Sequence, residues 1–118
     1  MSIDLKYSVI IPTYNRVKTL VLTLDSLCHQ TISPEIYEIL IIDDGSTDDT
    51  ESHVTCHMSH VTGPVVRYFK AEHGGAAKAR NLGITHARGD ILFFTDDDCV
   101  VPSNWMESLI NGYAKYPD

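Results

Sequence analysis

Strand and helix signals alternate along this 118-residue chain, and the alternation restricts the folds that it can adopt. Four apolar runs are typical of buried strands, at residues 7–11, 37–42, 65–69 and 91–94. Helix signals follow each of them, at residues 17–28, 47–60, 76–88 and 103–116. This pattern predicts one α/β domain over residues 1–118, a Rossmann-like parallel sheet with strand order 3-2-1-4 and helices on both faces.

Residues at the ends of these elements carry further signals. Pro12 cannot donate to a strand ladder, so we expect it to close the first strand. Ser46, with Asp49 three residues later, resembles a capping box and predicts the start of the second helix. Gly89 suits a helix C-cap, and Gly83 inside the third helix indicates close backbone packing against a sheet.

Composition excludes several classes of protein. The net charge of -7 argues against nonspecific binding of nucleic acid. No apolar run approaches the ~20 residues of a transmembrane helix, and the N-terminus lacks the pattern of a signal peptide. The three cysteines, Cys28, Cys56 and Cys99, fit no zinc or disulfide spacing, which indicates a reducing, cytoplasmic setting.

Three consecutive carboxylates, Asp96, Asp97 and Asp98, follow the fourth apolar run, and residues 89–102 contain no basic side chain. Adjacent carboxylates repel one another, and their oxygens suit Mg²⁺ or Mn²⁺ with phosphate completing the shell. A solvated acidic turn before the next helix explains the run equally well. Polar clusters also follow the first two strands, at residues 13–16 and 43–44. A doubly wound sheet would bring all three clusters to one rim, which favours a ligand site.

Two cations, Lys78 and Arg80, lie in the first turns of the predicted third helix, where the helix dipole disfavours positive charge. Something negative should therefore lie near them. The carboxylates at the strand ends would meet this need, and so would a bound diphosphate, which matches the planar donor fork of arginine. The two interpretations are compatible, since an empty site can pair with itself.

Four blocks together resemble family 2 glycosyltransferases in order and spacing: VIIPTYNR at 9–16, EILIIDDGS at 38–46, ARNLG at 79–83, and residues 89–102. The resemblance implies the GT-A fold, a UDP- or GDP-sugar donor, an Mn²⁺ or Mg²⁺ ion, and inverting transfer of the sugar to an unknown acceptor. It implies that Pro12, Thr13 and Tyr14 line the base pocket, and that Asp44 bonds the base or ribose. The full set of donor-binding residues expected is Pro12, Thr13, Tyr14, Arg16, Asp43, Asp44, Lys78, Arg80 and Asp96.

The metal motif of the family is Asp-x-Asp, usually followed by another acid and a proline. If Pro102 anchors a gapless match, Thr95 takes the first position, Asp97 binds the metal and Asp96 faces the ribose. A shift by one residue makes Asp96 and Asp98 the pair. We expect Asp97 to be the main ligand, assisted by Asp96 or Asp98.

Family members that resemble this chain continue for another hundred or more residues, which carry the acceptor site and the catalytic base. We therefore expect no catalytic residue in this chain, which looks like the donor half of a larger cytoplasmic enzyme, peripheral at the membrane in its full-length form. Without the usual cover, the edge of the fourth strand should promote homo-oligomers.

Two other classes of protein remain open. A receiver-like phosphoacceptor domain also clusters carboxylates at strand ends, but it has strand order 2-1-3-4 and an aspartate after its middle strand. A non-catalytic nucleotide-binding or assembly module would share the donor site. Separately, the helical spacing of His53, His57 and His60 could bind zinc or nickel, although a solvated polar face is favoured.

Overall fold

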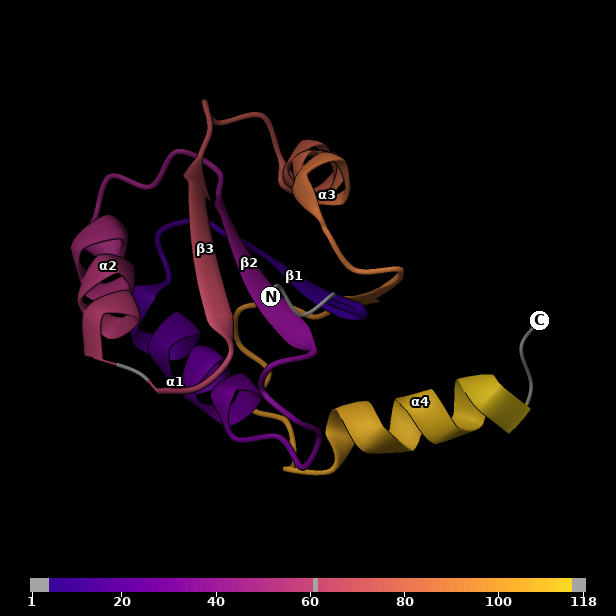
Figure 1. Ribbon diagram of the computed structural model, residues 1–118. Coiled ribbons are helices and arrows are strands. Elements are labelled where there is room, and N and C mark those ends of the chain that lie inside the picture. The colour runs from indigo at the N-terminus through magenta and orange to yellow at the C-terminus, as the bar shows by residue number, and fades with distance from the viewer. Residues whose placement is uncertain (1–4, 61, 116–118) are drawn as a thin grey trace.

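The computed structural model describes residues 5–60 and 62–115, in which strands and helices alternate as predicted (Figure 1). The elements are β1 (Tyr7–Thr13), α1 (Val17–Cys28), β2 (Tyr37–Asp43), α2 (Thr50–His60), β3 (Val65–Lys70), α3 (Ala76–His86), β4 (Ile91–Phe94) and α4 (Trp105–Lys115). The strands form a parallel sheet in the order β3-β2-β1-β4. The predicted order is confirmed, and the order of a receiver domain is excluded.

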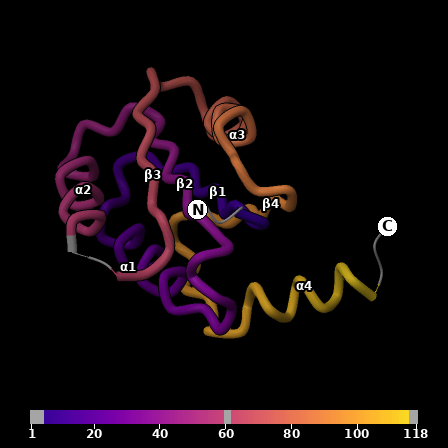
Figure 2. The backbone as a smooth tube through the Cα atoms, in the orientation of Figure 1, coloured from indigo at the N-terminus to yellow at the C-terminus, as the bar shows by residue number. Residues whose placement is uncertain are grey.

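Helices cover both faces of the sheet, as expected (Figure 2). On one face, alternate residues of β1 and β2 pack against α1, α2 and α4, and this larger core includes Leu20, Leu24, Val54 and Met106. On the other face, Ile10, Leu40 and Ile42 pack against α3 through Ala79. Because both faces of β1 and β2 are covered, these strands are almost continuously apolar.

The two glycines singled out from the sequence both lie where chains approach closely. A Cβ atom at Gly83 would lie 2.5 Å from Cγ2 of Ile10, so the predicted packing of α3 on the sheet is confirmed. The prediction for Gly89 was wrong, because α3 ends at His86 and Ala87 is its C-cap. A Cβ at Gly89 would lie 2.6 Å from the carbonyl carbon of Tyr7, so the contact with β1 requires glycine there.

β1 continues through Pro12 to Thr13, so Pro12 does not close the strand as expected. The carbonyl of Thr13 accepts the N–H of Asp44 (2.9 Å), which turns the nitrogen of Pro12 away from β2. On the side that it faces, the pairing of β1 with β4 has already stopped at Ile10–Phe94. No ladder donor is lost at Pro12, and the strand can continue.

α2 begins at Thr50, later than the capping signal at Ser46 predicted. The Ser46 hydroxyl instead accepts the N–H of Asn15 (2.9 Å). The Asn15 side chain in turn accepts the N–H groups of Thr47 (2.8 Å) and Asp48 (3.2 Å), which holds this segment against the loop after β1. The Asp48 carboxylate accepts the N–H of Thr50 (3.0 Å), and the N–H of His53 donates to the carbonyl of Asp49 (3.1 Å) as the helix begins.

α4 starts at Trp105 rather than at residue 103, because the carbonyl of Ser103 accepts the N–H of Thr31 (2.9 Å) instead of a helical donor. Its predicted end at Tyr116 lies outside the described residues. In the described part of the chain, every helix is too short or too polar to serve as a membrane span.

Candidate functional site

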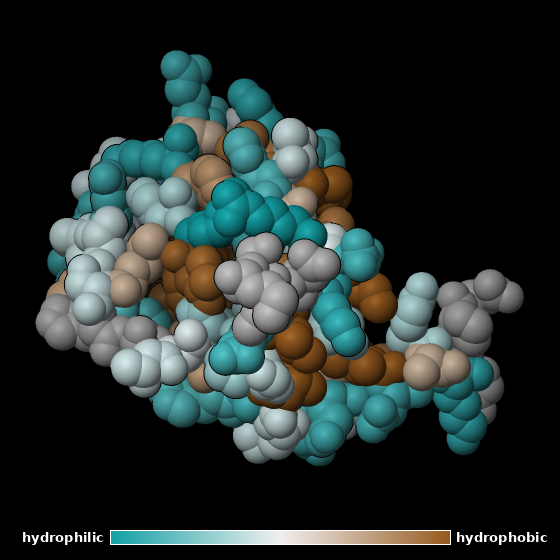
Figure 3. Space-filling view, in the orientation of Figure 1, coloured by the Kyte–Doolittle hydropathy of each residue, from teal (hydrophilic) through white to brown (hydrophobic). Residues whose placement is uncertain are grey.

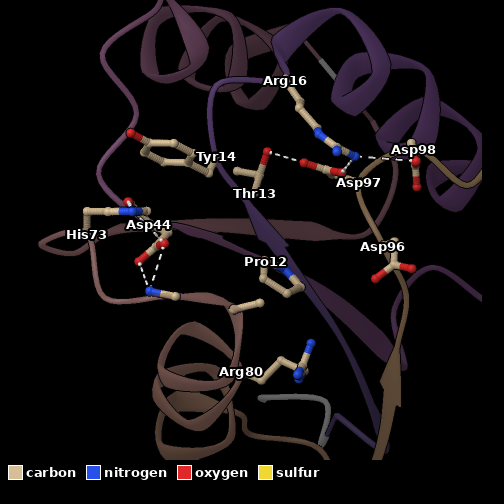
Figure 4. A pocket seen from close by; sticks show the side chains of 12 residues that line it. Pro12, Thr13, Tyr14, Arg16, Asp44, His73, Arg80, Asp96, Asp97 and Asp98 are labelled. Carbon is tan, nitrogen blue, oxygen red and sulfur yellow. Dashed lines mark hydrogen bonds and ion pairs between the residues drawn. The ribbon is translucent and has the colours of Figure 1, made fainter.

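The carboxyl ends of β1, β2 and β4 meet the start of α3 around one pocket of about 380 Å³ (Figure 4). Its lining residues are Pro12, Thr13, Tyr14, Arg16, Asp44, His73, Gly75, Ala76, Arg80, Asp96, Asp97 and Asp98. The three polar clusters therefore share one rim. Of the residues predicted to bind the donor or the metal, only Asp43 and Lys78 lie outside the lining.

Asp97 is the most firmly held acid of the acidic run. It is 6 % exposed, and its carboxylate accepts a hydrogen bond from the hydroxyl of Thr13 (2.9 Å). Its backbone carbonyl accepts the hydroxyl of Thr23 on α1 (3.0 Å). These contacts fix the buried carboxylate at the edge of the pocket, whereas Asp96 and Asp98 are exposed.

The guanidinium of Arg16 lies between two carboxylates of the run. It is 3.5 Å from Asp97 and 3.4 Å from Asp98 (Figure 4). The positive charge of Arg16 thus occupies the place where a cation would bridge this pair. More than half of its side chain is exposed, so it can move with little loss of packing.

The donor set fits a divalent ion that takes most of its ligands from elsewhere. Within the residues that the structure describes, no group of three or more His, Cys, Asp or Glu side chains is arranged to hold a metal. Mg²⁺ and similar ions are commonly held by one or two carboxylates together with substrate phosphates. Asp97 and Asp98 can supply that share, and Asp96 is the third acid on the same rim.

Asp44 is a buried, ionised hydrogen-bond acceptor. It is 5 % exposed and accepts the N–H of Gly74 (2.8 Å) and of Gly75 (3.0 Å). Nδ1 of His73 lies 2.9 Å from its Oδ2. Desolvation would raise the pKa of Asp44, but the two glycine N–H groups and His73 outweigh it and hold the pKa below the ordinary value.

His73 also contacts Tyr14, and the sequence did not single it out. The two rings are stacked with centroids 4.2 Å apart and planes inclined by 27°. From the sequence, residues 72–75 indicate only a turn. The sequence signal that could have identified it is an aromatic ring three residues after the end of β3, because the carboxyl end of that strand lies on the rim that carries Asp44.

Two of the residues expected at the site lie behind or beside it. Asp43 is fully buried, accepts the N–H of Ser46 (2.8 Å) and the hydroxyl of Tyr68, and so shapes the turn that presents Asp44. Desolvation, then the bond to Asp43, raises the pKa of Tyr68 above its ordinary value. Lys78 lines a neighbouring hollow of about 370 Å³, to which Asp44 also contributes.

The histidines of α2 form no metal site in the described part of the chain. His53 is half-exposed and lies 3.7 Å from Asp49, the residue just before the helix. The Nδ1 atom of His57 is buried without a hydrogen-bond partner, and desolvation lowers the pKa of that ring. The side chain of His60 lies outside the described residues.

The family that matches this chain and a relative of the chain are both described as glycosyltransferases. The family described as "Glycosyl transferase family 2" matches residues 8–118. An uncharacterized glycosyltransferase of Rickettsia felis is 45% identical over 96 residues, which are 80% of this chain and 15% of that protein. The chain thus spans a small part of that relative.

Solved structures with the same fold carry nucleotide sugars. S. aureus TarS 1-349 in complex with UDP-GlcNAc has a TM-score of 0.85 at 28% identity, over 96% of this chain and 32% of that one. The mannosyltransferase PcManGT from Pyrobaculum calidifontis, in complex with GDP-Man and Mn²⁺, has a TM-score of 0.84 at 29% identity, over 96% and 32%.

Proposed function

Because the chain belongs to glycosyl transferase family 2 and has the GT-A fold, we propose that it is the donor-binding domain of a glycosyltransferase. Its ligand would be a UDP- or GDP-sugar, as in the TarS and PcManGT complexes. The observation that carries the proposal is the pocket at the carboxyl ends of the strands. It combines an aromatic face, an ionised acceptor, an arginine and a buried carboxylate.

The base end of the donor would lie at Tyr14 and Asp44. A nucleobase offers a flat face and ring N–H donors, which match the ring of Tyr14 and the ionised carboxylate of Asp44. Pro12 and Thr13 bring Tyr14 to the rim, because they end β1 directly before it, and Asp44 follows the end of β2. Asp43 would support the site from behind through the turn at Ser46.

The diphosphate end would lie between Arg80 and the acidic run. Arg80 enters the pocket from α3, and its planar fork suits phosphate oxygens. Asp97, with Asp98 or Asp96, would hold an Mn²⁺ or Mg²⁺ ion, which neutralises the charge of the diphosphate when bound. Arg16 would then be released from the two carboxylates that it now pairs, and would be free to bind the donor.

Inverting transfer needs a general base at the acceptor hydroxyl, on the side of the sugar opposite the leaving diphosphate. The pocket carboxylates already have roles at the base, the ribose or the metal. We therefore propose that the base and the acceptor site lie outside the described residues. The chain itself would then bind the donor without transferring its sugar.

Calorimetry on the 118-residue chain tests the proposal. UDP or GDP should bind, and Mn²⁺ should strengthen the binding. A control variant, Asp25→Asn, changes an exposed acid on α1 and should leave the affinity unchanged. Absence of binding for both nucleotides, with and without Mn²⁺, would refute the donor-binding function.

A further inference from the structure

The ring of His73 makes two contacts at the proposed base site. Its face stacks on Tyr14, with ring centroids 4.2 Å apart. Its edge meets Asp44, with Nδ1 at 2.9 Å from Oδ2 of the carboxylate and 3.1 Å from the backbone carbonyl oxygen. Figure 4 shows the imidazole beside the Asp44 carboxylate and next to the Tyr14 ring. The imidazole of His73, a flat ring that can carry an N–H, thus contacts the Tyr14 ring and the Asp44 carboxylate at the same time.

We propose that His73 occupies the place of the nucleobase and must be displaced before the donor binds. The inference rests on the proposed function, in which Tyr14 and Asp44 receive the base. A base that stacks on Tyr14 and donates an N–H to Asp44 would make the two contacts that His73 now makes. The base and the His73 ring cannot hold these contacts at the same time.

The spacing leaves no room for a base between the rings of Tyr14 and His73. Stacked aromatic pairs have centroids about 4.5–7 Å apart, so a distance of 4.2 Å between Tyr14 and His73 excludes a third ring between them. The remaining contacts of the Asp44 carboxylate are the N–H groups of Gly74 and Gly75, which belong to the backbone at the start of α3. The contact made by His73 is the one that a side-chain rotation can free.

Displacement needs only the side chain to move. The backbone of His73 packs against Gly45, where an added Cβ would lie 2.9 Å from the His73 nitrogen. The side chain, in contrast, is 59% exposed. A rotation of the ring into solvent would uncover both Tyr14 and Asp44 while the loop keeps its course.

The contacts of His73 with Tyr14 and Asp44 should weaken the apparent affinity for the donor. When the ring is rotated away in only a fraction of the molecules, the measured dissociation constant rises by the inverse of that fraction. A stacked pair supplemented by one hydrogen bond holds the site closed by an amount that corresponds to about three- to tenfold in affinity. Removing the ring should increase the binding affinity by this factor, both for the nucleoside alone and for the nucleoside diphosphate.

Calorimetry of UDP with Mn²⁺, and of uridine alone, on His73→Ala tests the inference. Both ligands should bind about three- to tenfold more tightly than to the native chain. His73→Phe keeps a stacking ring without the bond to Asp44, and should give an intermediate gain. His53→Ala, an exposed histidine on α2, is the matched control and should change nothing. Circular dichroism checks that each variant is folded.

A second readout follows the ring directly. In the free domain the carbon-bound protons of His73 should be shifted by the ring current of Tyr14, and uridine should remove that shift. Unchanged affinity in His73→Ala would overturn the inference. Weaker binding would also overturn it, since His73 would then contact the bound base rather than occupy the position that the base takes. If neither the native chain nor any variant binds a nucleotide, the proposed function itself fails.

Discussion

Asp97 and Arg16 illustrate how individual side chains prepare the pocket. Asp97 is buried at the edge of the sheet, where its carboxylate accepts a hydrogen bond from Thr13 and lies beside the positive charge of Arg16. Burying a carboxylate without such partners is costly, so Thr13 and Arg16 favour the buried position of Asp97. Since Arg16 is largely exposed, its contribution to the stability of the fold is small. The pair is therefore suited to exchange one cation for another.

Replacing Asp97 by asparagine should remove the effect of Mn²⁺ on nucleotide binding, because the neutral amide is a poor ligand for a hard cation. The amide oxygen of the variant would still accept the Thr13 hydroxyl, so the fold should persist. Calorimetry of UDP with and without Mn²⁺ measures the effect. If Asp97→Asn keeps the metal dependence and Asp98→Asn loses it, the metal motif is shifted by one residue, to Asp96 and Asp98.

Replacing Arg80 by alanine should weaken the binding of UDP by about 1.5–3 kcal/mol, since a charge-assisted bond to phosphate is lost. Binding of uridine should hardly change. Lys78→Ala should have the smaller effect on UDP, because Lys78 does not line the main pocket. An equal loss for uridine and UDP in Arg80→Ala would assign Arg80 to the base instead of the diphosphate.

α3 shows how an element brings the site together. It packs on β1 and β2 through a face of small residues, and its close approach is possible because Gly83 lies against Ile10. Its N-terminus supplies the glycine N–H groups that bind Asp44, and Arg80 points from it into the pocket. The distance between α3 and the sheet thus sets the width of the site.

Gly83→Ala should destabilise the domain even though alanine favours helices. The added methyl group would lie 2.5 Å from Ile10, and overpacking costs about 1–3 kcal/mol, against a propensity gain of about 1 kcal/mol. Gly112→Ala in α4 is the matched control. Apart from its chain neighbours and the backbone of its own helix, no atom of the described residues lies within 4 Å of that Cβ, so the substitution should stabilise the domain by about 1 kcal/mol. Denaturant unfolding measures both, and a Gly83→Ala chain as stable as the native one contradicts the packing argument.

At the scale of the whole molecule, α4 and β4 leave an apolar surface uncovered. A groove of about 250 Å³ lies between them, and its lining residues are Ile91, Leu92, Phe93, Phe94, Trp105, Leu109, Ile110 and Tyr113. Phe94, Leu109 and Tyr113 are 45–52% exposed. Figure 3 shows apolar residues gathered between the sheet and α4. Within the described residues β4 pairs only with β1, so one of its edges is open as well.

The isolated 118-residue chain should therefore associate with itself, because open strand edges and apolar patches are pairing surfaces. Leu109→Glu places a charge in the groove and should shift the chain towards the monomer. Leu22 is an exposed leucine on α1 that does not line the groove, so Leu22→Glu should leave the association unchanged. Light scattering after gel filtration distinguishes the species, and a native chain that is monomeric at all concentrations would refute the association.

Local patterns in the sequence determined the architecture. Apolar runs and helical spacing predict the elements, and the handedness of parallel crossovers leaves few strand orders, of which β3-β2-β1-β4 is observed. The same patterns place residues 13–16, 43–44 and 96–98 at strand ends, so their meeting at one rim follows from topology alone. Gly83 was predictable as well, because glycine in a helix interior needs a compensating contact.

Tertiary structure decided which side chains pair within that rim. Pro12 continues its strand because β4 has already ended beside it, and Ser46 bonds Asn15 instead of capping a helix. Arg16 meets Asp97 across 81 residues of sequence, and His73 stacks on Tyr14. Local spacing carries no information about such partners. They depend on how the packing of α1 and α3 positions the loops. The positions of the loops then determine which opposite charge, acceptor or ring each polar group contacts.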